Sequence, residues 1–350
     1  SGSAGRILRV IDSIVTNNST GILRGTSSSS FEVSYSNVWG NSTDVSGSLT
    51  GTGRFSANPL YVGPPADLQI TSNSPCRFAS STGDDIGALP YAGHATSGLL
   101  GTLWTDTTLT AAGSPYTISG DLTVAPGVTL TIEPGATLRF ATTDAMASGA
   151  NTSETELRVL GRVVAAGTAD DPITFESPGT GTNAWYGVLL MGTGSSTFAH
   201  VTIREATYGL WQQESAAHSI SRLNVSSCST GLRVTSGVLT ADSVVVEGGS
   251  TGVHVGTPAA ATLTNAILRS NTSYGLRVEH SSSTVADTLL HSSTVYGNGT
   301  GVYLTGSSGS AGRILRVLNS IVTNNSTGIL RGTSSSAFEV SYTNVWGNST

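Results

Sequence analysis

The feature that most constrains the fold is a long internal repeat. Residues 1–43 recur as residues 308–350, an offset of 307, and 39 of the 43 positions are identical. A shared composition bias cannot produce such a match, so the sequence covers one full period of a tandem array together with an overlap. We therefore expect it to be internal to a longer chain.

A shorter repeat lies inside the long one, with steps of 21 to 27 residues from Gly209 onward. Each copy has a glycine followed by an aliphatic residue. The glycines are Gly21, Gly209, Gly231, Gly252, Gly275, Gly301 and Gly328, and the aliphatic residues are Ile22, Leu210, Leu232, Val253, Leu276, Val302 and Ile329. The period is too short for two helices but fits three short strands, which form one coil of a solenoid whose aliphatic residues stack.

Two further positions of the short repeat are informative. The residue six before the glycine is β-branched in every copy except that of Arg269, and Asn17, Asn271 and Asn324 stand four before it. We expect the glycine to supply a left-handed backbone where the chain turns. Asparagine also tolerates that conformation, and stacked asparagines can bond along the solenoid.

The repeated segments resemble a known superfamily. "SIVTNNSTGILRG", "LNVSSCSTGLRV" and "LTNAILRSNTSYGLRV" look like rungs of right-handed parallel β-helix proteins of the pectin-lyase-like superfamily. Residues 113–140 resemble the first coils of bacterial secreted β-helix proteins, and residues 58–91 resemble their closing segment. The resemblance implies an all-β fold, a right-handed parallel β-helix (β-solenoid) in tandem modules. It implies no single function, because the superfamily holds lyases, hydrolases, adhesins and inert fibres.

The opening and closing segments predict the domain organisation. Residues 1–92 are expected to form the C-terminal rungs and closing segment of one module, and residues 93–350 the following module without its closing segment. Residues 92–101, "AGHATSGLLG", have the composition of a flexible linker and contain the expected boundary.

Composition agrees with an all-β chain and excludes several functions. Gly, Ser and Thr occupy 144 of 350 positions, and all 16 basic residues are Arg, so lysine chemistry is absent. A net charge of −6 without an Arg cluster argues against a nucleic-acid partner. The longest apolar runs are far too short for a membrane span. Cys76 and Cys228 provide neither a disulfide framework nor a zinc cluster, and Cys228 is expected to be a small buried residue.

No catalytic constellation is evident. The acidic pairs Asp84/Asp85 and Asp170/Asp171 stand in turn-like segments, and the histidines fall on different rungs without ligand spacing. We therefore expect no enzyme and no cofactor. The main alternative is a polysaccharide lyase or hydrolase, and a lyase could use Arg as base with acidic ligands for Ca²⁺.

Aromatic and arginine side chains near the rung glycines form a candidate glycan platform. Tyr208, Trp211, Tyr274, Tyr296 and Tyr303 cluster around these positions, and Arg233 and Arg277 each stand two residues after a rung glycine. Aromatic rings on one face could stack on sugars. The same residues could instead be packing groups and exposed ion pairs. The predicted binding residues are Tyr208, Trp211, Arg233, Tyr274 and Arg277.

These observations favour a structural role. Near-identical copies suit a spacer or polymer unit, because a catalytic domain gains little from repetition end to end. We expect a segment of an extracellular or cell-surface fibre or giant adhesin, with itself as partner, through tandem modules or filament assembly, and with surface glycans as further partners. The alternative is a polysaccharide lyase, hydrolase or glycan-binding β-helix.

Overall fold

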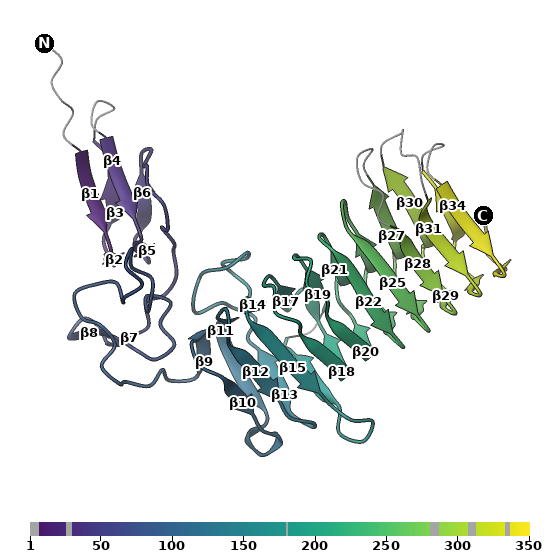
Figure 1. The fold of residues 1–350 in the computed structure, drawn as a ribbon, viewed down its shortest axis with the longest axis horizontal. Coiled ribbons are helices and arrows are strands. Elements are labelled where there is room, and N and C mark those ends of the chain that lie inside the picture. The colour runs from purple at the N-terminus through teal and green to yellow at the C-terminus, as the bar shows by residue number, and fades with distance from the viewer. Residues whose placement is uncertain (1–6, 26–29, 180, 281–286, 307–312, 333–336) are drawn as a thin grey trace, which may run out of the picture.

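The structure is a computed structural model that describes residues 7–25, 30–179, 181–280, 287–306, 313–332 and 337–350. Its main part is a parallel β-solenoid in which 27 strands, β9 to β35, form one hydrogen-bonded network. Successive coils follow one another from teal to yellow along the row of strands in Figure 1. The predicted all-β solenoid is confirmed. The helical element of the described residues is the single turn η1 (Ala111–Gly113), and no helix among them is long and apolar enough to cross a membrane.

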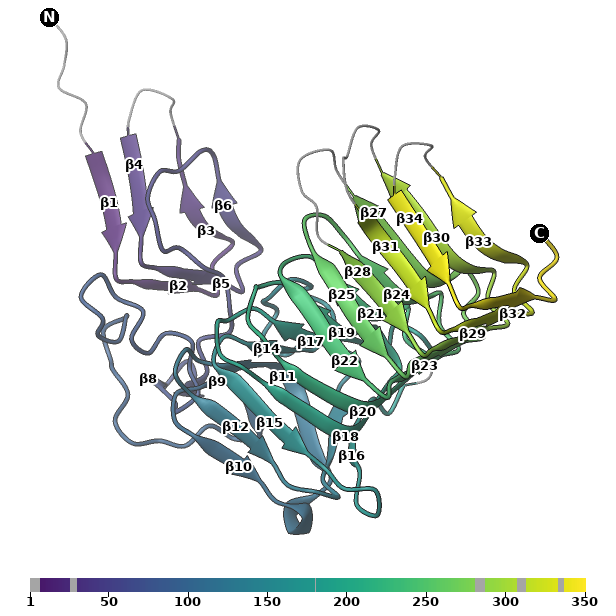
Figure 2. The ribbon, with the colours of Figure 1, turned by 45° about the vertical axis from the view of Figure 1, so that its right-hand side comes forward.

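Each full coil contributes one strand to each of three parallel stacks, here called sheets 1, 2 and 3 in chain order (Figure 2). Sheet 1 contains β9 (Leu99–Leu103), the end of β11 (Tyr116–Val124), β14 (Glu156–Val159), β17 (Trp185–Leu190), β19 (Ala206–Gln212), β21 (Thr230–Val234), β24 (Thr251–Val255), β27 (Tyr274–His280), β30 (Thr300–Gly306) and β33 (Thr327–Arg331). Sheet 2 contains β10 (Thr107–Leu109), β12 (Thr129–Ile132), β15 (Arg162–Ala166), the starts of β18 (Thr197–Arg204) and β20 (Ser219–Ser226), β22 (Val238–Asp242), β25 (Ala260–Thr264), β28 (Thr288–His291), β31 (Arg313–Leu318) and β34 (Ala337–Ser341). Sheet 3 contains the start of β11, β13 (Thr137–Phe140), β16 (Ile173–Glu176), the ends of β18 and β20, β23 (Val245–Glu247), β26 (Ile267–Arg269), β29 (Thr294–Tyr296), β32 (Ile321–Thr323) and β35 (Asn344–Trp346).

An N-terminal unit carries the same coil pattern on a smaller scale. Its strands pair in parallel as β1 (Ile7–Ile11) with β4 (Ser30–Ser34), β2 (Ile14–Thr16) with β5 (Asn37–Trp39), and β3 (Thr20–Leu23) with β6 (Thr43–Ser46). An antiparallel hairpin follows, made of β7 (Tyr61–Gly63) and β8 (Asp67–Ile70). This purple unit forms sheets of its own and lies beside the first coils of the solenoid (Figure 1).

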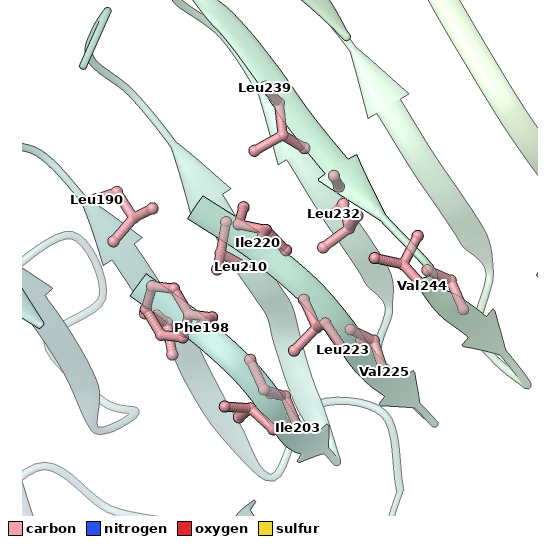
Figure 3. Close-up of a cluster of buried hydrophobic side chains, with 14 of the residues drawn as sticks. Leu190, Phe198, Ile203, Leu210, Ile220, Leu223, Val225, Leu232, Leu239 and Val244 are labelled. Carbon is pink, nitrogen blue, oxygen red and sulfur yellow. The ribbon is translucent and has the colours of Figure 1, made fainter. Parts of the chain in front are cut away.

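The core is a column of stacked aliphatic side chains, as predicted (Figure 3). In sheet 1, Leu210 pairs with Leu232, Leu232 with Val253, and the series continues through Leu276 and Val302. All of these are buried, and so is Ile22, whereas Ile329 is partly buried against the core. Each coil thus buries a face that it could not bury alone.

The rung glycines are not turn residues, which corrects the prediction. Six of them lie inside the strands of sheet 1, Gly21 lies inside β3 of the N-terminal unit, and none has a positive φ. A Cβ on Gly275 would lie 2.6 Å from the carbonyl oxygen of Gly301 and 2.8 Å from Cγ1 of Val295. The same close approach recurs at Gly209, Gly231, Gly252 and Gly301, where the atoms met include the carbonyl of the next glycine. Glycine is therefore required by contact between coils.

Two other positions make the turns. The corner between sheets 2 and 3 has a non-glycine residue with positive φ in many coils: Asp12, Tyr35, His200, Arg222, Ser243, Asn265, Ser292, Asn319 and Tyr342. The corner between sheets 3 and 1 has a second residue with positive φ, which is glycine in some coils and another residue in the rest: Asn17, Gly40, Glu205, Ser227, Gly248, Ser270, Gly297, Asn324 and Gly347. Of the three asparagines expected to tolerate a left-handed backbone, Asn17 and Asn324 adopt it, whereas Asn271 does not.

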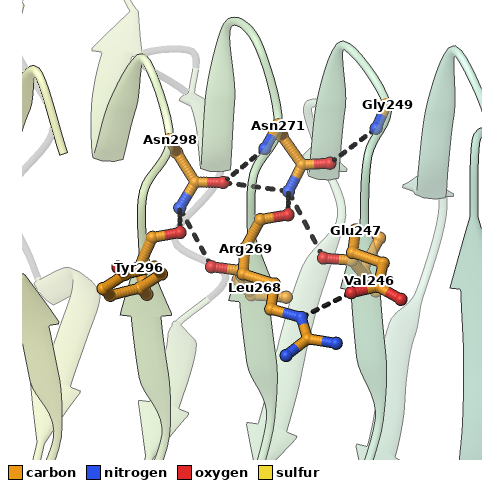
Figure 4. A network of polar contacts seen from close by, with 8 residues as sticks. All are labelled: Val246, Glu247, Gly249, Leu268, Arg269, Asn271, Tyr296 and Asn298. Atoms are coloured by element: carbon orange, nitrogen blue, oxygen red, sulfur yellow. Dashed lines mark hydrogen bonds and ion pairs between the residues drawn. The ribbon is translucent and has the colours of Figure 1, made fainter. Parts of the chain in front are cut away.

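Asparagines also stack along the solenoid, but in a different register from the one predicted. The ladder joins Asn271, Asn298, Asn325 and Asn348, so Asn325 rather than Asn324 continues from Asn271. Asn298 Oδ1 accepts hydrogen bonds from N and Nδ2 of Asn271 at 3.0 and 2.9 Å (Figure 4). In the coil of Asn271, the stretch from the inward residue to the rung glycine is one residue longer than in the neighbouring coils. For the same reason the inward residue that pairs with Val246 is Leu268, and not Arg269, which stands six residues before the glycine.

The predicted closing segment packs between the N-terminal unit and the solenoid. Ile70, Cys76 and Ile86 form a buried cluster against Ile14 and Phe55. Of the expected linker, residues 99–101 lie in strand β9. The division at residue 92 stays a prediction, although the main network of strands begins at β9.

Candidate functional site

The candidate site is a row of outward side chains on sheet 1. Because side chains alternate along a strand, the residue after each buried aliphatic residue faces outward. In consecutive coils these residues are Trp211, Arg233, His254, Arg277 and Tyr303, each paired in register with the next. With Tyr208 and Tyr274, they are called the outer strip.

At the first end of the outer strip, aromatic rings pack around a guanidinium group. The ring of Tyr208 lies 4.8 Å from that of Trp211 and meets Tyr186 edge-on at 5.4 Å. The Arg233 guanidinium lies 4.2 Å from the centre of the Trp211 ring, and its Nη1 donates to Tyr208 Oη at 2.7 Å. These contacts fix the orientation of groups that are only half-buried and still reach solvent.

The other end has a similar composition. The rings of Tyr274 and Tyr303 stack at 5.2 Å with 12° between their planes. The Arg277 guanidinium lies 5.4 Å from the centre of the Tyr274 ring and forms an ion pair with Glu279. Each end of the strip thus presents aromatic faces next to an arginine.

His254 joins the two ends, between Arg233 and Arg277 in the same row. Burial lowers the pKa of its imidazole, Glu279 opposes this, and the two arginines lower it further. The net shift is downward, so the ring is neutral at pH 7. Its Nε2 lies 3.3 Å from Glu279 Oε1. The strip therefore offers two fixed cations, one anion and a neutral imidazole between aromatic faces.

The structure places all five predicted binding residues on this one face, whereas Tyr296 lies on sheet 3 and belongs to another surface. Sequence reasoning missed His254, which it grouped with scattered histidines. The signal was present, because His254 stands two residues after Gly252, as Arg233 and Arg277 do after their glycines.

The acidic pairs are built into local structure. Asp85 accepts hydrogen bonds from the amides of Phe78 and Tyr91 at 3.2 and 2.9 Å. The amide of Asp171 donates to Thr168 Oγ1 at 3.0 Å in the turn before β16. Within the described ranges, no group of three or more His, Cys, Asp or Glu residues is placed to hold a metal ion. Calcium stays an expectation tied to the lyase alternative.

A second polar site was not predicted. Asp121 and Glu156 are buried and lie next to each other. Both carboxylates approach Gly149 closely: a Cβ placed on this glycine would lie 2.0 Å from Glu156 Oε1 and 2.6 Å from Asp121 Oδ2. Asp121 accepts from the Glu156 amide at 3.0 Å and from Ser148 Oγ at 2.8 Å. The alternation of residues along the strands gives both acids an outward position. The sequence does not show which loop covers them.

This buried acid pair favours the protonated state. Burial raises the pKa of Asp121 to about 8, with the charges of Glu156 and Asp144 adding to the shift. Burial also raises the pKa of Glu156 to about 7, opposed by the amide of Ala150 and the charge of Arg158. Asp121 and Arg158 line a hollow of 530 Å³ together with residues of the N-terminal unit. The pair can therefore hold a proton near neutral pH beside the contact between the two parts.

Comparisons with known proteins agree with the fold. A family model described as "Right handed beta helix region" matches residues 183–347, and one described as "Pectate-lyase like beta helix domain" matches residues 101–235. The architecture is therefore a right-handed parallel β-helix, as predicted. No curated protein and no solved structure matches the chain.

Proposed function

We propose that this right-handed parallel β-helix is a structural segment of an extracellular or cell-surface fibre or giant adhesin built from tandem modules. The observation that carries the proposal is the contact between the closing segment and the first coils of the solenoid. The Asn58 amide donates to the Met146 carbonyl at 2.9 Å, and the Thr102 amide donates to the Asn73 carbonyl at 2.7 Å. Trp104 Nε1 donates to the Ser74 carbonyl at 3.0 Å.

Apolar contacts reinforce these hydrogen bonds. Ala57, Leu100 and Met146 form a buried cluster, and the rings of Phe78 and Trp104 meet edge-on at 5.1 Å. A junction of this kind fixes the orientation of the two units and transmits force between them, which a flexible linker does not do. Inside the solenoid, stretching would break hydrogen bonds between coils in every layer, which suits a rod that works by its length.

Electron microscopy of the protein purified from its natural source tests this role. Rods with a regular axial repeat are expected. Compact particles without such a repeat would contradict the structural role.

A second candidate function is glycan binding at the outer strip. The aromatic faces and arginines of sheet 1 lie on consecutive coils about 4.8 Å apart, so a sugar chain along the solenoid could contact several of them. Acidic sugars would add ion pairs with Arg233 and Arg277. The match to a pectate-lyase-like family model fits this alternative in general terms.

Retention on immobilised glycans tests the second candidate. Trp211→Ala and Arg233→Ala are expected to weaken retention, while Tyr296→Ala, an exposed aromatic on sheet 3, is the matched control. Equal effects of all three changes would contradict a site on sheet 1. Turnover of uronate glycans with or without Ca²⁺, abolished by Arg233→Ala or Arg277→Ala, would instead favour the lyase alternative.

A further inference from the structure

The buried acid pair lies beneath a loop that also contacts the closing segment. The loop is residues 141–155, between β13 and β14, and is called the covering loop. On one side, the carbonyls of Ala145 and Met146 accept hydrogen bonds from Nδ2 and N of Asn58 at 3.1 and 2.9 Å. Met146 also packs with Ala57 in a buried cluster. The covering loop is thus one of the surfaces that form the junction between the closing segment and the solenoid.

On its other side, the covering loop rests on the acid pair. Ser148 Oγ donates to Asp121 Oδ2 at 2.8 Å, and the Ala150 amide donates to Glu156 Oε1 at 2.8 Å. The carboxylate of Asp144, within the loop, accepts from the Asp121 amide at 2.8 Å. A displacement of the loop from the pair would therefore also withdraw the carbonyls that bind the closing segment.

The surroundings compensate a negative charge on the pair poorly. Asp121 is 2% exposed, and Glu156 is fully buried. Glu156 Oε2 has no hydrogen-bond partner among the residues that the structure describes. The neighbouring cation, Arg158, has its Nε 3.2 Å from Oε1 instead. A buried carboxylate oxygen without a partner is costly, whereas a carboxyl group that keeps its proton is neutral.

The other groups around the pair do not supply a second cation. Asp144 adds a further negative charge from the loop. The hydroxyl of Tyr186, from β17, stays uncharged because burial raises its pKa. From the N-terminal unit and the closing segment, the described residues that line the hollow beside Asp121 carry no charge, among them Phe55 and Pro75. Two negative charges on the pair would therefore repel each other and face an uncharged surface.

We propose that the acid pair is a pH-dependent switch at the junction: protonated carboxyl groups let the covering loop hold the closing segment, and their ionisation releases it. On release, the carboxyl O–H bonds break, the protons go to solvent water, and water beneath the loop solvates the two carboxylates.

The direction of the switch follows from burial. In the closed junction, burial raises the pKa of Asp121 to about 8 and that of Glu156 to about 7. In an open junction both groups are solvated, and each pKa returns toward its ordinary value near 4. Closing therefore binds protons. The closed junction is favoured at low pH, and this contribution is lost as the pH rises from about 4 to about 8.

This inference rests on the proposed structural role, because it concerns the junction that carries that role, but it fails separately. Its test measures the junction within the chain of 350 residues and needs no filament. An absence of rods in electron microscopy would leave the result at the junction unchanged. A junction that does not respond to pH would, in turn, leave the rods in place.

Hydrogen exchange with mass spectrometry measures the opening of the junction. The amides of Asn58 and Thr102 donate across it, so peptides that contain them report its opening, and strand β24 is the internal reference. Each exchange rate is divided by the intrinsic rate at the same pH, and a chelator excludes neutralisation of the acids by metal ions. Protection at the junction should fall roughly tenfold per pH unit between about pH 5 and about pH 7, while that of β24 stays constant.

Substitutions test whether the acid pair is responsible. Asp121→Asn and Glu156→Gln each replace an acid by a neutral side chain of the same shape, which imitates the protonated state. Each should raise protection of the junction at about pH 8 at least tenfold, and the double variant should abolish the fall. Glu154→Gln is the matched control, since it removes an acid of the same loop whose Oε2 accepts from Thr207 at 3.1 Å. It should leave the fall unchanged.

A fall in protection that is confined to the junction, and that both acid variants but not the control reduce, would support the switch. Three results would overturn it. One is protection that does not change with pH. Another is a fall that neither acid variant reduces, or that the control reduces equally. The third is an equal fall in β24, since the whole solenoid rather than the junction would then be opening.

Discussion

The asparagine ladder allows a direct test of how coils stabilise one another. Asn325 is 2% exposed, and its Oδ1 accepts from N and Nδ2 of Asn298 at 2.9 and 3.0 Å. Its Nδ2 donates to the Val295 carbonyl at 3.2 Å and to Asn348 Oδ1 at 2.9 Å. Asn325→Ala removes all of these bonds and leaves the Asn298 amide buried without an acceptor.

The expected cost follows from these contacts. A buried polar group left without a partner costs about 1–3 kcal/mol, and each additional net hydrogen bond lost costs about 1 kcal/mol. We therefore expect Asn325→Ala to lower the free energy of local opening by about 3 kcal/mol, which corresponds to a loss of hydrogen-exchange protection of roughly a hundredfold. The loss should concentrate in residues 290–330, because each coil contacts only its neighbours.

The repeat supplies a matched control. Asn18 occupies the equivalent position in the first copy and makes similar bonds to Asn41, but it is exposed to solvent. Water can replace the lost partner there, so Asn18→Ala should cost less than about 0.5 kcal/mol. Hydrogen exchange with mass spectrometry measures both variants. Equal losses of protection in the two variants, or no loss in Asn325→Ala, would refute the argument that burial determines how much free energy an asparagine of the ladder contributes.

Three further predictions concern the core, the contact between coils and the buried acids. Leu232→Ala should lower stability by about 3 kcal/mol in urea unfolding, because Leu232 is fully buried and the cavity is enclosed by the next coils. Gly275→Ala should destabilise by a similar amount, because its Cβ would overlap the Gly301 carbonyl, whereas Gly256→Ala, whose nearest atom is 3.6 Å away, should be tolerated. The pKa of Asp121, about 8, lies above its usual value of 3.8, so this group favours folding at low pH and that contribution is lost as the pH rises from about 4 to about 8. The melting temperature should fall across that range, and Asp121→Asn should flatten the profile; an equally steep fall in the variant would contradict the assignment.

Much of the fold could be predicted because the information is repeated. The spacing of Leu210, Leu232, Val253, Leu276 and Val302 gives the coil length, and each residue lies over the next in the structure. A stack of equivalent residues can be predicted without knowing any contact between distant parts of the chain. The placement of the predicted binding residues on one face followed from the same register.

The errors concern features that a local sequence pattern does not show: how closely backbones approach, the exact length of each coil, and which loop covers a face. Glycine was expected at turns because of its conformational freedom, but Gly275 is required by the carbonyl 2.6 Å from its Cβ position. The stacking of Asn325 rather than Asn324 depends on a difference of one residue in coil length. The pair Asp121 and Glu156 was missed because a loop covers an outward face, and a pattern of alternation cannot indicate such a cover.

Comparing the two copies of the long repeat distinguishes the structural features set by a coil's own sequence from those set by its neighbours. Their left-handed residues agree closely: φ is 51° at Asp12 and 50° at Asn319, and 48° at Tyr35 and 52° at Tyr342. The backbone path is thus set within the coil, even though one copy is covered by the closing segment and the other is open. Burial, by contrast, is set by the neighbour. A coil whose backbone path does not depend on what covers it can be stacked on the coil before it without rearranging that coil, which is how a solenoid is extended one coil at a time.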